Sequence, residues 1–181
     1  TINISKQNKN GRTAFMLAAQ NNTNVEVITF LYKTFKDSIE QNNDAGITAF
    51  LLAAQNNKEI EVVQYLYNTF KNAINTNKQD NYGHNSFMLA AWKNTNVEVI
   101  RYLYIKFKDT IDINNQDNNG RNAFMLAAQN NPNVKVLQYL FKDTIDINKQ
   151  DDDGNTAFML AALSNTSKEV IQYLHNISKN T

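Results

Sequence analysis

The sequence predicts an all-α solenoid, in which antiparallel helix pairs stack and are joined by hairpin-like loops. Two observations lead to this fold class. A ten-residue phrase that begins with glycine returns five times, for example as GRTAFMLAAQ and GITAFLLAAQ, at periods of 35, 37, 37 and 34 residues. Each copy is followed by a second apolar segment, such as VEVIRYLY, whose apolar residues recur at the spacing of a helix. Two helices for each of five repeats therefore account for the chain.

Composition and charge exclude several classes of function. The chain has 181 residues, 42% of them hydrophobic, with a formal net charge of +1 and no cysteine. Because Lys and Arg are spread among nearly equal numbers of Asp and Glu, no basic field is available for nucleic acid, which is not an expected partner. No apolar run approaches the roughly 20 residues of a membrane span, so no membrane contact is expected. The lack of cysteine excludes disulfides and thiolate chemistry.

The first helix of each repeat is expected to begin after a Thr or Asn whose side chain accepts a hydrogen bond from a free backbone N–H group. An aromatic residue that recurs in every repeat is typical of a stacking core, so one aromatic column in each helix is expected to be buried. The capping column is Thr13, Thr48, Asn85, Asn122 and Thr156. The two aromatic columns are Phe15, Phe50, Phe87, Phe124 and Phe158, and Phe30, Tyr65, Tyr102, Tyr139 and Tyr173.

The link between the two helices of a repeat begins with a recurring asparagine. Asparagine tolerates the left-handed backbone conformation of a sharp reversal, so such a turn is predicted here. Three repeats then show the spacing of a capping box, which predicts that Thr caps the second helix. The asparagines are Asn22, Asn57, Asn94, Asn131 and Asn165, and the boxes pair Thr23 with Glu26, Thr95 with Glu98, and Thr166 with Glu169.

The segment between repeats, such as IDINNQDNNG from Ile111 to Gly120, is expected to form an extended finger with a tight turn, in which glycine supplies a positive φ. The second helix varies in length. Repeats one to three contain three residues that repeat four lacks, so its second helix is expected to be about one turn shorter. The inserted residues are Tyr32 to Thr34, Tyr67 to Thr69 and Tyr104 to Lys106.

The recurring phrase D-x-x-G-x-T-A-F-M-L-A-A resembles the ankyrin repeat pattern D-x-x-G-x-T-P-L-H-x-A-A. In repeat five, Asp151, Gly154, Thr156 and Leu160 take the family positions. The family's Pro is replaced here by Ala or Ser, and its His by Met or Leu. The resemblance covers essentially the whole chain. It implies that each repeat is a turn, two antiparallel helices and a finger-like hairpin.

We expect a single domain over residues 1–181. The opening TINISKQNKNG aligns with TIDINKQDDDG later in the chain, so the sequence begins in the hairpin of a repeat whose helices are missing. This leads us to expect a fragment of a longer protein. The predicted divisions are a partial repeat, 1–7, and five full repeats, 8–42, 43–79, 80–116, 117–150 and 151–181.

The sequence offers few residues for catalysis or for a bound cofactor. Of the two histidines, His84 stands in a hairpin column that otherwise holds Arg, Ile or Asn, and His175 stands in the last helix, where it replaces Tyr. The acidic run from Asp151 to Asp153 lacks the alternating carboxylates and the glutamate of a calcium loop. One glycine per repeat leaves none for a phosphate loop. We therefore expect a non-enzyme with no catalytic residue, no metal and no cofactor.

Candidate binding residues are expected in columns that vary between repeats, because a constant scaffold presents those columns on a shared concave face. These columns flank the glycine and end the first helix. Repeat three differs most, since it carries aromatic residues where the others have mainly Asn, Arg and Gln. Aromatic side chains and Arg are enriched at binding hot spots. The predicted partner-binding residues are Tyr82, His84, Trp92, Lys93, Arg12, Ile47 and Arg121.

The leading hypothesis is a scaffold that binds another protein through its hairpins and first helices. A second hypothesis makes the chain the targeting or substrate-recruiting arm of a larger enzyme or effector whose catalytic part lies elsewhere. A third, a structural spacer, predicts no patterned variation on the surface, and Trp92 would then only cover a neighbouring helix. We expect a monomer in the cytoplasm, or in the cytosol of a host cell if the chain belongs to an effector.

Overall fold

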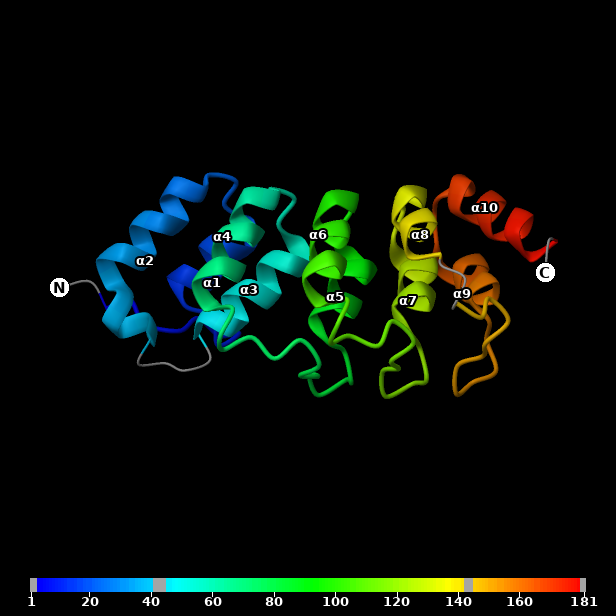
Figure 1. Ribbon diagram of the computed structural model, residues 1–181, viewed down its shortest axis with the longest axis horizontal. Helices are drawn as coiled ribbons and strands as arrows, with labels where there is room; N and C mark the ends of the chain where they lie inside the picture. The colour runs from blue at the N-terminus through cyan, green and yellow to red at the C-terminus, as the bar shows by residue number, and fades with distance from the viewer. Residues whose placement is uncertain (1–2, 41–44, 142–144, 180–181) are drawn as a thin grey trace. The chain divides into compact units, whose positions relative to one another are not determined.

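A computed structural model describes residues 3–40, 45–141 and 145–179. Ten helices lie in these ranges, and no β-strand occurs within them. The helices follow one another as pairs along the chain (Figure 1). The predicted class, an all-α solenoid of stacked helix pairs, is therefore confirmed.

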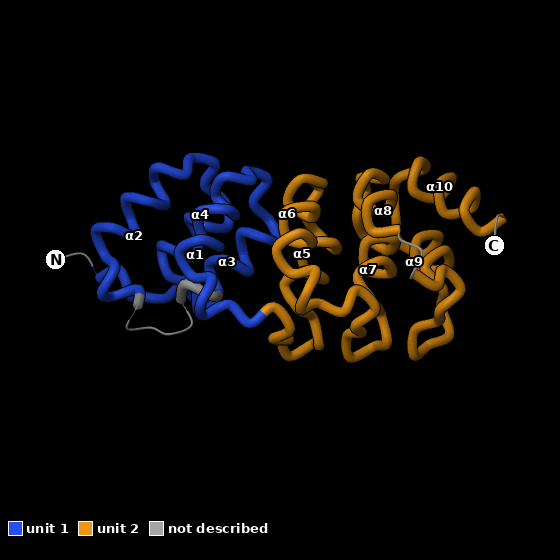
Figure 2. Tube along the Cα trace, viewed as in Figure 1, with its two compact units in different colours: residues 1–75 blue, residues 76–181 orange. Residues whose placement is uncertain are grey.

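The chain divides into two compact units, residues 1–75 and residues 76–181 (Figure 2). In the N-terminal unit, the two first helices pack against each other, and each second helix packs against the first helix of its own repeat. The single domain expected over residues 1–181 stays a prediction. The helices of this unit are α1 (Ala14–Asn21), α2 (Val25–Glu40), α3 (Ala45–Asn56) and α4 (Ile60–Phe70).

The C-terminal unit holds three repeats. Its first helices, α5, α7 and α9, lie side by side in that order, and its second helices, α6, α8 and α10, pack in the same order. The bounds are α5 (Ser86–Lys93), α6 (Val97–Phe107), α7 (Ala123–Asn130), α8 (Val134–Leu140), α9 (Ala157–Ser164) and α10 (Lys168–Ser178). α8 has 7 residues and α6 has 11, which confirms the shorter second helix of repeat four.

The predicted caps of the first helices are confirmed in four repeats. Thr13 Oγ1 accepts a hydrogen bond from the N–H of Met16 at 3.3 Å, and the other three make the equivalent bond. The prediction for Thr48 is wrong, because this residue lies inside α3, which begins at Ala45. Most other repeats have Asn or Asp in the position of Ala45, and the high helix propensity of Ala favours an earlier start.

The caps of the second helices lie one residue later than predicted. Asn96 Oδ1 accepts from the N–H of Glu98 at 2.9 Å, and Ser167 Oγ accepts from Val170 at 3.4 Å. Asn24 makes the same type of bond in the first repeat. The capping boxes at Thr23, Thr95 and Thr166 are therefore wrong. The physical reason is that the preceding asparagine already bonds the N–H of the cap residue, which holds that residue at the helix boundary.

The asparagines between the helices are not left-handed. Asn22 has φ −79 and ψ 127, Asn131 has φ −84 and ψ 118, and no non-glycine residue in the described ranges has a positive φ. The predicted left-handed turn is therefore wrong. An extended backbone suits many residue types, so the recurrence of asparagine must come from its side chain.

In three repeats, the asparagine side chain ties its turn to the turn of the preceding repeat. Asn131 Nδ2 donates to the carbonyl oxygens of Ala91 and Asn94, both at 2.9 Å, while its Oδ1 accepts from the N–H of Asn133 at 3.0 Å. Asn57 and Asn165 make the same three bonds in their repeats. We call this series the asparagine ladder. It satisfies buried carbonyl groups at the ends of the first helices, which have no partner within the helix.

The two aromatic columns differ in burial. In the first helices, the Phe residues of repeats one to four are at most 1% exposed, as predicted, whereas Phe158 in the last repeat is 38% exposed. The core prediction for the second helices is wrong, since Phe30 is 63% exposed and the equivalent tyrosines are half-buried. Aliphatic residues such as Ile100 and Leu103 form the buried stripe there. Partial burial raises the pKa of Tyr139 above its ordinary value.

One core position carries an unsatisfied polar group. Ser86 is 2% exposed, and its hydroxyl has no hydrogen-bond partner among the described residues. The other four repeats have Ala in this column. Since burying an unpaired hydroxyl costs about 1–3 kcal/mol, Ser86→Ala is expected to raise the free energy of unfolding by about 1 kcal/mol. Urea denaturation measures this, with the exposed Ser164→Ala as control, and a destabilised Ser86→Ala variant would contradict it.

Candidate functional site

An aspartate organises each hairpin of the predicted site. In repeat three, Asp80 Oδ1 accepts hydrogen bonds from the backbone N–H groups of Tyr82 and His84, both at 2.9 Å. In repeat four, Asp117 Oδ1 accepts from the N–H of Arg121 at the same distance. These bonds close the turn around the glycine, which has a positive φ in both hairpins. The residues before and after the glycine are thereby held in fixed positions.

His84 lies between the carboxylates of two successive hairpins. Its Nδ1 bonds Asp80 Oδ2 at 3.3 Å, and its Nε2 is 3.2 Å from Asp117 Oδ2. The Nε2 atom makes no hydrogen bond, so it approaches Asp117 closely without hydrogen-bond geometry. His84 is 5% exposed, and the Asp117 side chain is fully buried. His84 therefore lies beneath the surface residues that surround it and is too buried to contact a partner.

Above His84, two larger aromatic side chains reach the surface. The His84 ring lies 6.1 Å from the Tyr82 ring and 5.4 Å from the Trp92 ring, measured between centroids. Lys93 Nζ lies 4.3 Å from the centroid of the Trp92 ring, within the range of a cation–π contact. Tyr82 is 70% exposed, Trp92 is half-buried and Lys93 is exposed. We call Tyr82, His84, Trp92 and Lys93 the aromatic cluster.

Arg121 is a structural residue of the neighbouring hairpin. Its Nε and Nη2 lie 3.0 Å and 2.9 Å from Asp117 Oδ2, and its Nη1 donates to Gln129 Oε1 at 3.1 Å. The guanidinium group is thus shared between a buried carboxylate and the end of α7. Because Asp117 also contacts His84, Arg121 belongs to the support of the aromatic cluster.

The two remaining predicted residues belong to the N-terminal unit. Arg12 Nη1 donates to Gln20 Oε1 at 2.6 Å, which repeats the contact of Arg121 with Gln129. The residue after the glycine and the residue at the end of the first helix are therefore in contact in repeats one, three and four. The side chain of Ile47 lies outside the described residues. The structure brings together the five predicted residues of the C-terminal unit and places Arg12 in a separate, similar pair.

The repeated hairpins and helix pairs agree with a comparison to known families. A family model for ankyrin repeats (3 copies) matches residues 15–117 and 87–181. The chain belongs to the ankyrin repeat family. No curated protein matches it. Ankyrin repeats are protein–protein interaction modules, and within the described ranges no helix is long and apolar enough to cross a membrane.

Two residues of the ankyrin hairpin site were missed from the sequence. Asp117 joins His84 to Arg121, and Gln129 receives the guanidinium of Arg121. Asp117 lies in a column outside the variable ones, and Gln129 lies in the variable column of Trp92 but has the residue type that most repeats share there. The aspartate of the D-x-x-G phrase could have indicated Asp117, because the same residue type recurs as Asp80, Asp117 and Asp151.

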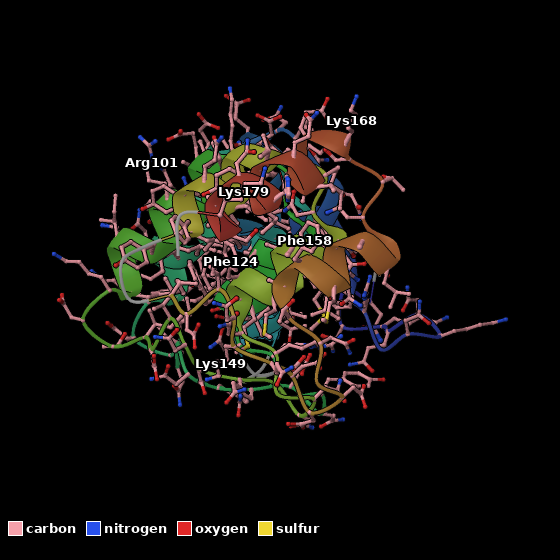
Figure 3. All side chains as sticks on the ribbon, turned by 90° about the vertical axis from the view of Figure 1, so that its right-hand side faces the viewer. Arg101, Phe124, Lys149, Phe158, Lys168 and Lys179 are labelled. Atoms are coloured by element: carbon pink, nitrogen blue, oxygen red, sulfur yellow. The ribbon has the colours of Figure 1, made fainter. Side chains whose placement is uncertain are left out.

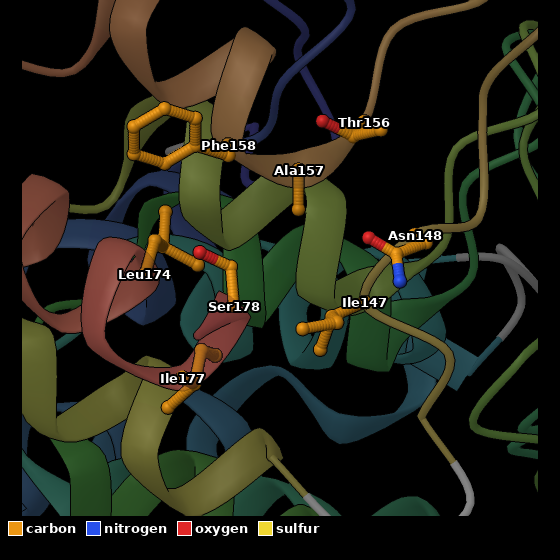
Figure 4. A pocket seen from close by; sticks show the side chains of 8 residues that line it. All are labelled: Ile147, Asn148, Thr156, Ala157, Phe158, Leu174, Ile177 and Ser178. Atoms are coloured by element: carbon orange, nitrogen blue, oxygen red, sulfur yellow. The ribbon is translucent and has the colours of Figure 1, made fainter. Parts of the chain in front are cut away.

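The chemistry of the site is suited to binding a surface. No group of three potential metal ligands occurs in the described part of the chain. A hollow lined by residues of α9, α10 and the loop before α9 has a cavity volume of about 30 Å³ (Figure 4). This is below the roughly 300–1,000 Å³ of small-molecule pockets. The aromatic cluster instead presents the exposed Tyr82 and Lys93 beside the half-buried Trp92 and the buried His84.

Proposed function

We propose that this ankyrin chain binds another protein through the aromatic cluster of repeat three. The observation that supports the proposal is the contrast between Tyr82, at 70% exposure, and the buried His84 that holds it. Aromatic anchors with few rotatable bonds contribute most when they are ordered before binding, because less conformational entropy is lost. The contacts from His84 to Tyr82 and Trp92 supply such ordering.

The support of the cluster also favours binding over simple packing. Asp117 is buried between His84 and Arg121, so two hairpins position one group of surface side chains. A tryptophan that only covered a neighbouring helix would not need to be positioned by residues of two hairpins. The proposed contact residues are Tyr82, Trp92 and Lys93, with His84 and Arg121 as positioning residues. A protein that carries this chain as a recruiting arm would use the same surface.

Trp92→Ala and Tyr82→Ala are each expected to weaken partner binding by at least ~2 kcal/mol, about thirtyfold in affinity, because truncating an interface anchor removes buried contacts. Peptides selected from a displayed library against the wild-type chain serve as partners, and calorimetry gives the Kd. The melting temperature should stay within a few degrees, since the deleted side chains are partly exposed.

Phe30→Ala is the matched control, because Phe30 is an aromatic residue with 63% exposure in a second-helix column. This variant should bind as the wild type does. If the selected peptides bind Trp92→Ala with unchanged affinity, or if Trp92→Ala unfolds the chain, the aromatic cluster is scaffold and the proposal fails.

A further inference from the structure

In the C-terminal unit, the residue after each hairpin glycine directs its side chain to the aspartate of its own hairpin. Arg121 Nε donates to its aspartate at 3.0 Å, and Asn155 Nδ2 lies 3.2 Å and 3.3 Å from the two carboxylate oxygens of its aspartate. His84 Nδ1 bonds Asp80 Oδ2 at 3.3 Å. Three different side chains therefore make the same contact in three successive repeats.

The contact of repeat three differs from the other two in its dependence on pH. A guanidinium group stays protonated and an asparagine amide does not titrate, whereas an unperturbed imidazole gains or loses its proton between about pH 5 and 8. The chain has two histidines, and the other one, His175, lies on α10, which runs from Lys168 towards Lys179 (Figure 3). His84 is therefore the one histidine of the hairpins.

The two ring nitrogens of His84 face carboxylates of two successive hairpins. Nδ1 lies 3.3 Å from Asp80 Oδ2, and Nε2 lies 3.2 Å from Asp117 Oδ2. A neutral imidazole carries one N–H group, so it donates to one aspartate and turns a lone pair towards the other. The buried Nε2 has no hydrogen-bond partner among the described residues. An imidazolium ion carries both N–H groups and, after a small turn of the ring, can donate to both aspartates.

A proton on His84 also balances the charges that surround the ring. Within the C-terminal unit, the ring contacts the carboxylates of Asp80 and Asp117, and Arg121 lies 2.9 Å from the second of these. Lys93 contacts the indole ring beside it and not the imidazole. Two carboxylates and one guanidinium group leave one negative charge, which the proton neutralises. An uncompensated buried charge is costly, and the Asp117 side chain is fully buried.

The His84 ring supports the more exposed aromatic side chains. Its centroid lies 6.1 Å from the ring of Tyr82, which is also titratable, and 5.4 Å from the ring of Trp92. A ring that is held by two aspartates has one orientation, so both neighbours pack on a fixed surface. A ring with one unpaired nitrogen is less restricted, so both neighbours lose part of this support.

We propose that protonation of His84 joins the hairpins of repeats three and four, orders Tyr82 and Trp92, and thereby tightens the binding of the protein partner. The inference rests on the proposed function and adds its regulation. An ordered anchor loses less conformational entropy on binding, so the protonated chain has the higher affinity. By linkage, the partner is then bound most tightly at low pH, and affinity is lost as the pH rises and the proton leaves.

Calorimetry at about pH 5.5 and pH 8, on either side of the usual imidazole range, tests this inference. The peptides are selected against the wild-type chain at the lower pH from a library without His, Asp, Glu or Cys, and their termini are blocked, so the peptide itself does not titrate. The Kd at the higher pH is expected to be at least about threefold larger, the effect of one weak hydrogen bond.

The neighbouring repeats supply the variants that remove the titration and keep the contact. His84→Arg introduces the side chain that repeat four uses, and His84→Asn introduces that of repeat five. Each should bind with the same Kd at both pH values, and circular dichroism confirms that each folds. His175→Asn is the matched control and should keep the pH dependence of the wild type. A wild-type Kd that does not change with pH, or a change that survives both replacements of His84, overturns the inference.

A measurement without a partner separates this inference from the proposed function. The ¹⁵N order parameter of the indole N–H of Trp92, the one tryptophan of the chain, should rise as the pH falls, and in His84→Arg it should not change with pH. An order parameter that is constant in the wild type overturns the inference, whatever Trp92→Ala does to binding. If Trp92→Ala leaves the Kd unchanged, the proposed function fails, even where the order parameter responds to pH.

Discussion

Gly83→Ala is expected to lower the free energy of unfolding by about 3 kcal/mol. Gly83 has φ +82, a conformation that costs a residue with a Cβ atom about 1–2 kcal/mol. A Cβ at this position would also lie 2.6 Å from the backbone nitrogen of Asn118 and 2.9 Å from the Cα of Asp117. The hairpin of repeat four would have to move, at a typical overpacking cost of about 1–3 kcal/mol.

Gly154→Ala is the matched control for this prediction. Gly154 also has φ +82, but its added Cβ would meet nothing within 4 Å. The free energy of unfolding of this variant should fall by only about 1–2 kcal/mol, the cost of the backbone conformation. Urea denaturation followed by Trp92 fluorescence reports on the C-terminal unit, because Trp92 is the one tryptophan of the chain. If the two variants lose the same free energy of unfolding, the close approach of the repeat-four hairpin is not a reason why position 83 requires glycine.

Asn131→Ala should also destabilise the chain by about 3 kcal/mol. The Asn131 side chain is fully buried and makes three hydrogen bonds, two of them to carbonyl groups of the preceding repeat. Its removal leaves these groups buried without partners, and each unsatisfied group costs about 1–3 kcal/mol. Because alanine is small, water can reach part of the vacated space, so the loss should be less than the sum of three such costs.

Asn22→Ala provides the comparison for Asn131→Ala. Asn22 makes one of the three bonds, from the N–H of Asn24, and its side chain donates to no carbonyl group of the described residues before it. We expect a loss of about 1 kcal/mol, the typical effect of one hydrogen bond. Denaturation followed by circular dichroism gives both values. If Asn22→Ala is as damaging as Asn131→Ala, then the asparagine column acts through its local turn, and the ladder between repeats adds no stability.

The variable columns show how far a candidate site can be predicted from sequence. The contrast of Tyr82 and Trp92 with their equivalents singled out repeat three, and the structure brings both rings to His84. The sequence did not separate surface residues from supporting ones. His84 and Arg121 were predicted as contact residues, but both are directed to Asp117. The roles of His84 and Arg121 depend on Asp117 in the hairpin of repeat four. Asp117 is 37 residues along the chain from Asp80, its equivalent in the hairpin of repeat three, so a local pattern does not reveal the contact.

By itself, the sequence determined the repeat, the all-α class, the glycine turns of four repeats and the caps of four first helices. These features depend on residues within one turn of each other, so their pattern is local and repeats visibly. Only the tertiary structure decided the role of the asparagines, since Asn131 bonds to residues 37 and 40 positions earlier. It also decided which aromatic column is core. Helical periodicity gives the position of a side chain around its helix, but burial depends on which neighbouring helix covers that position.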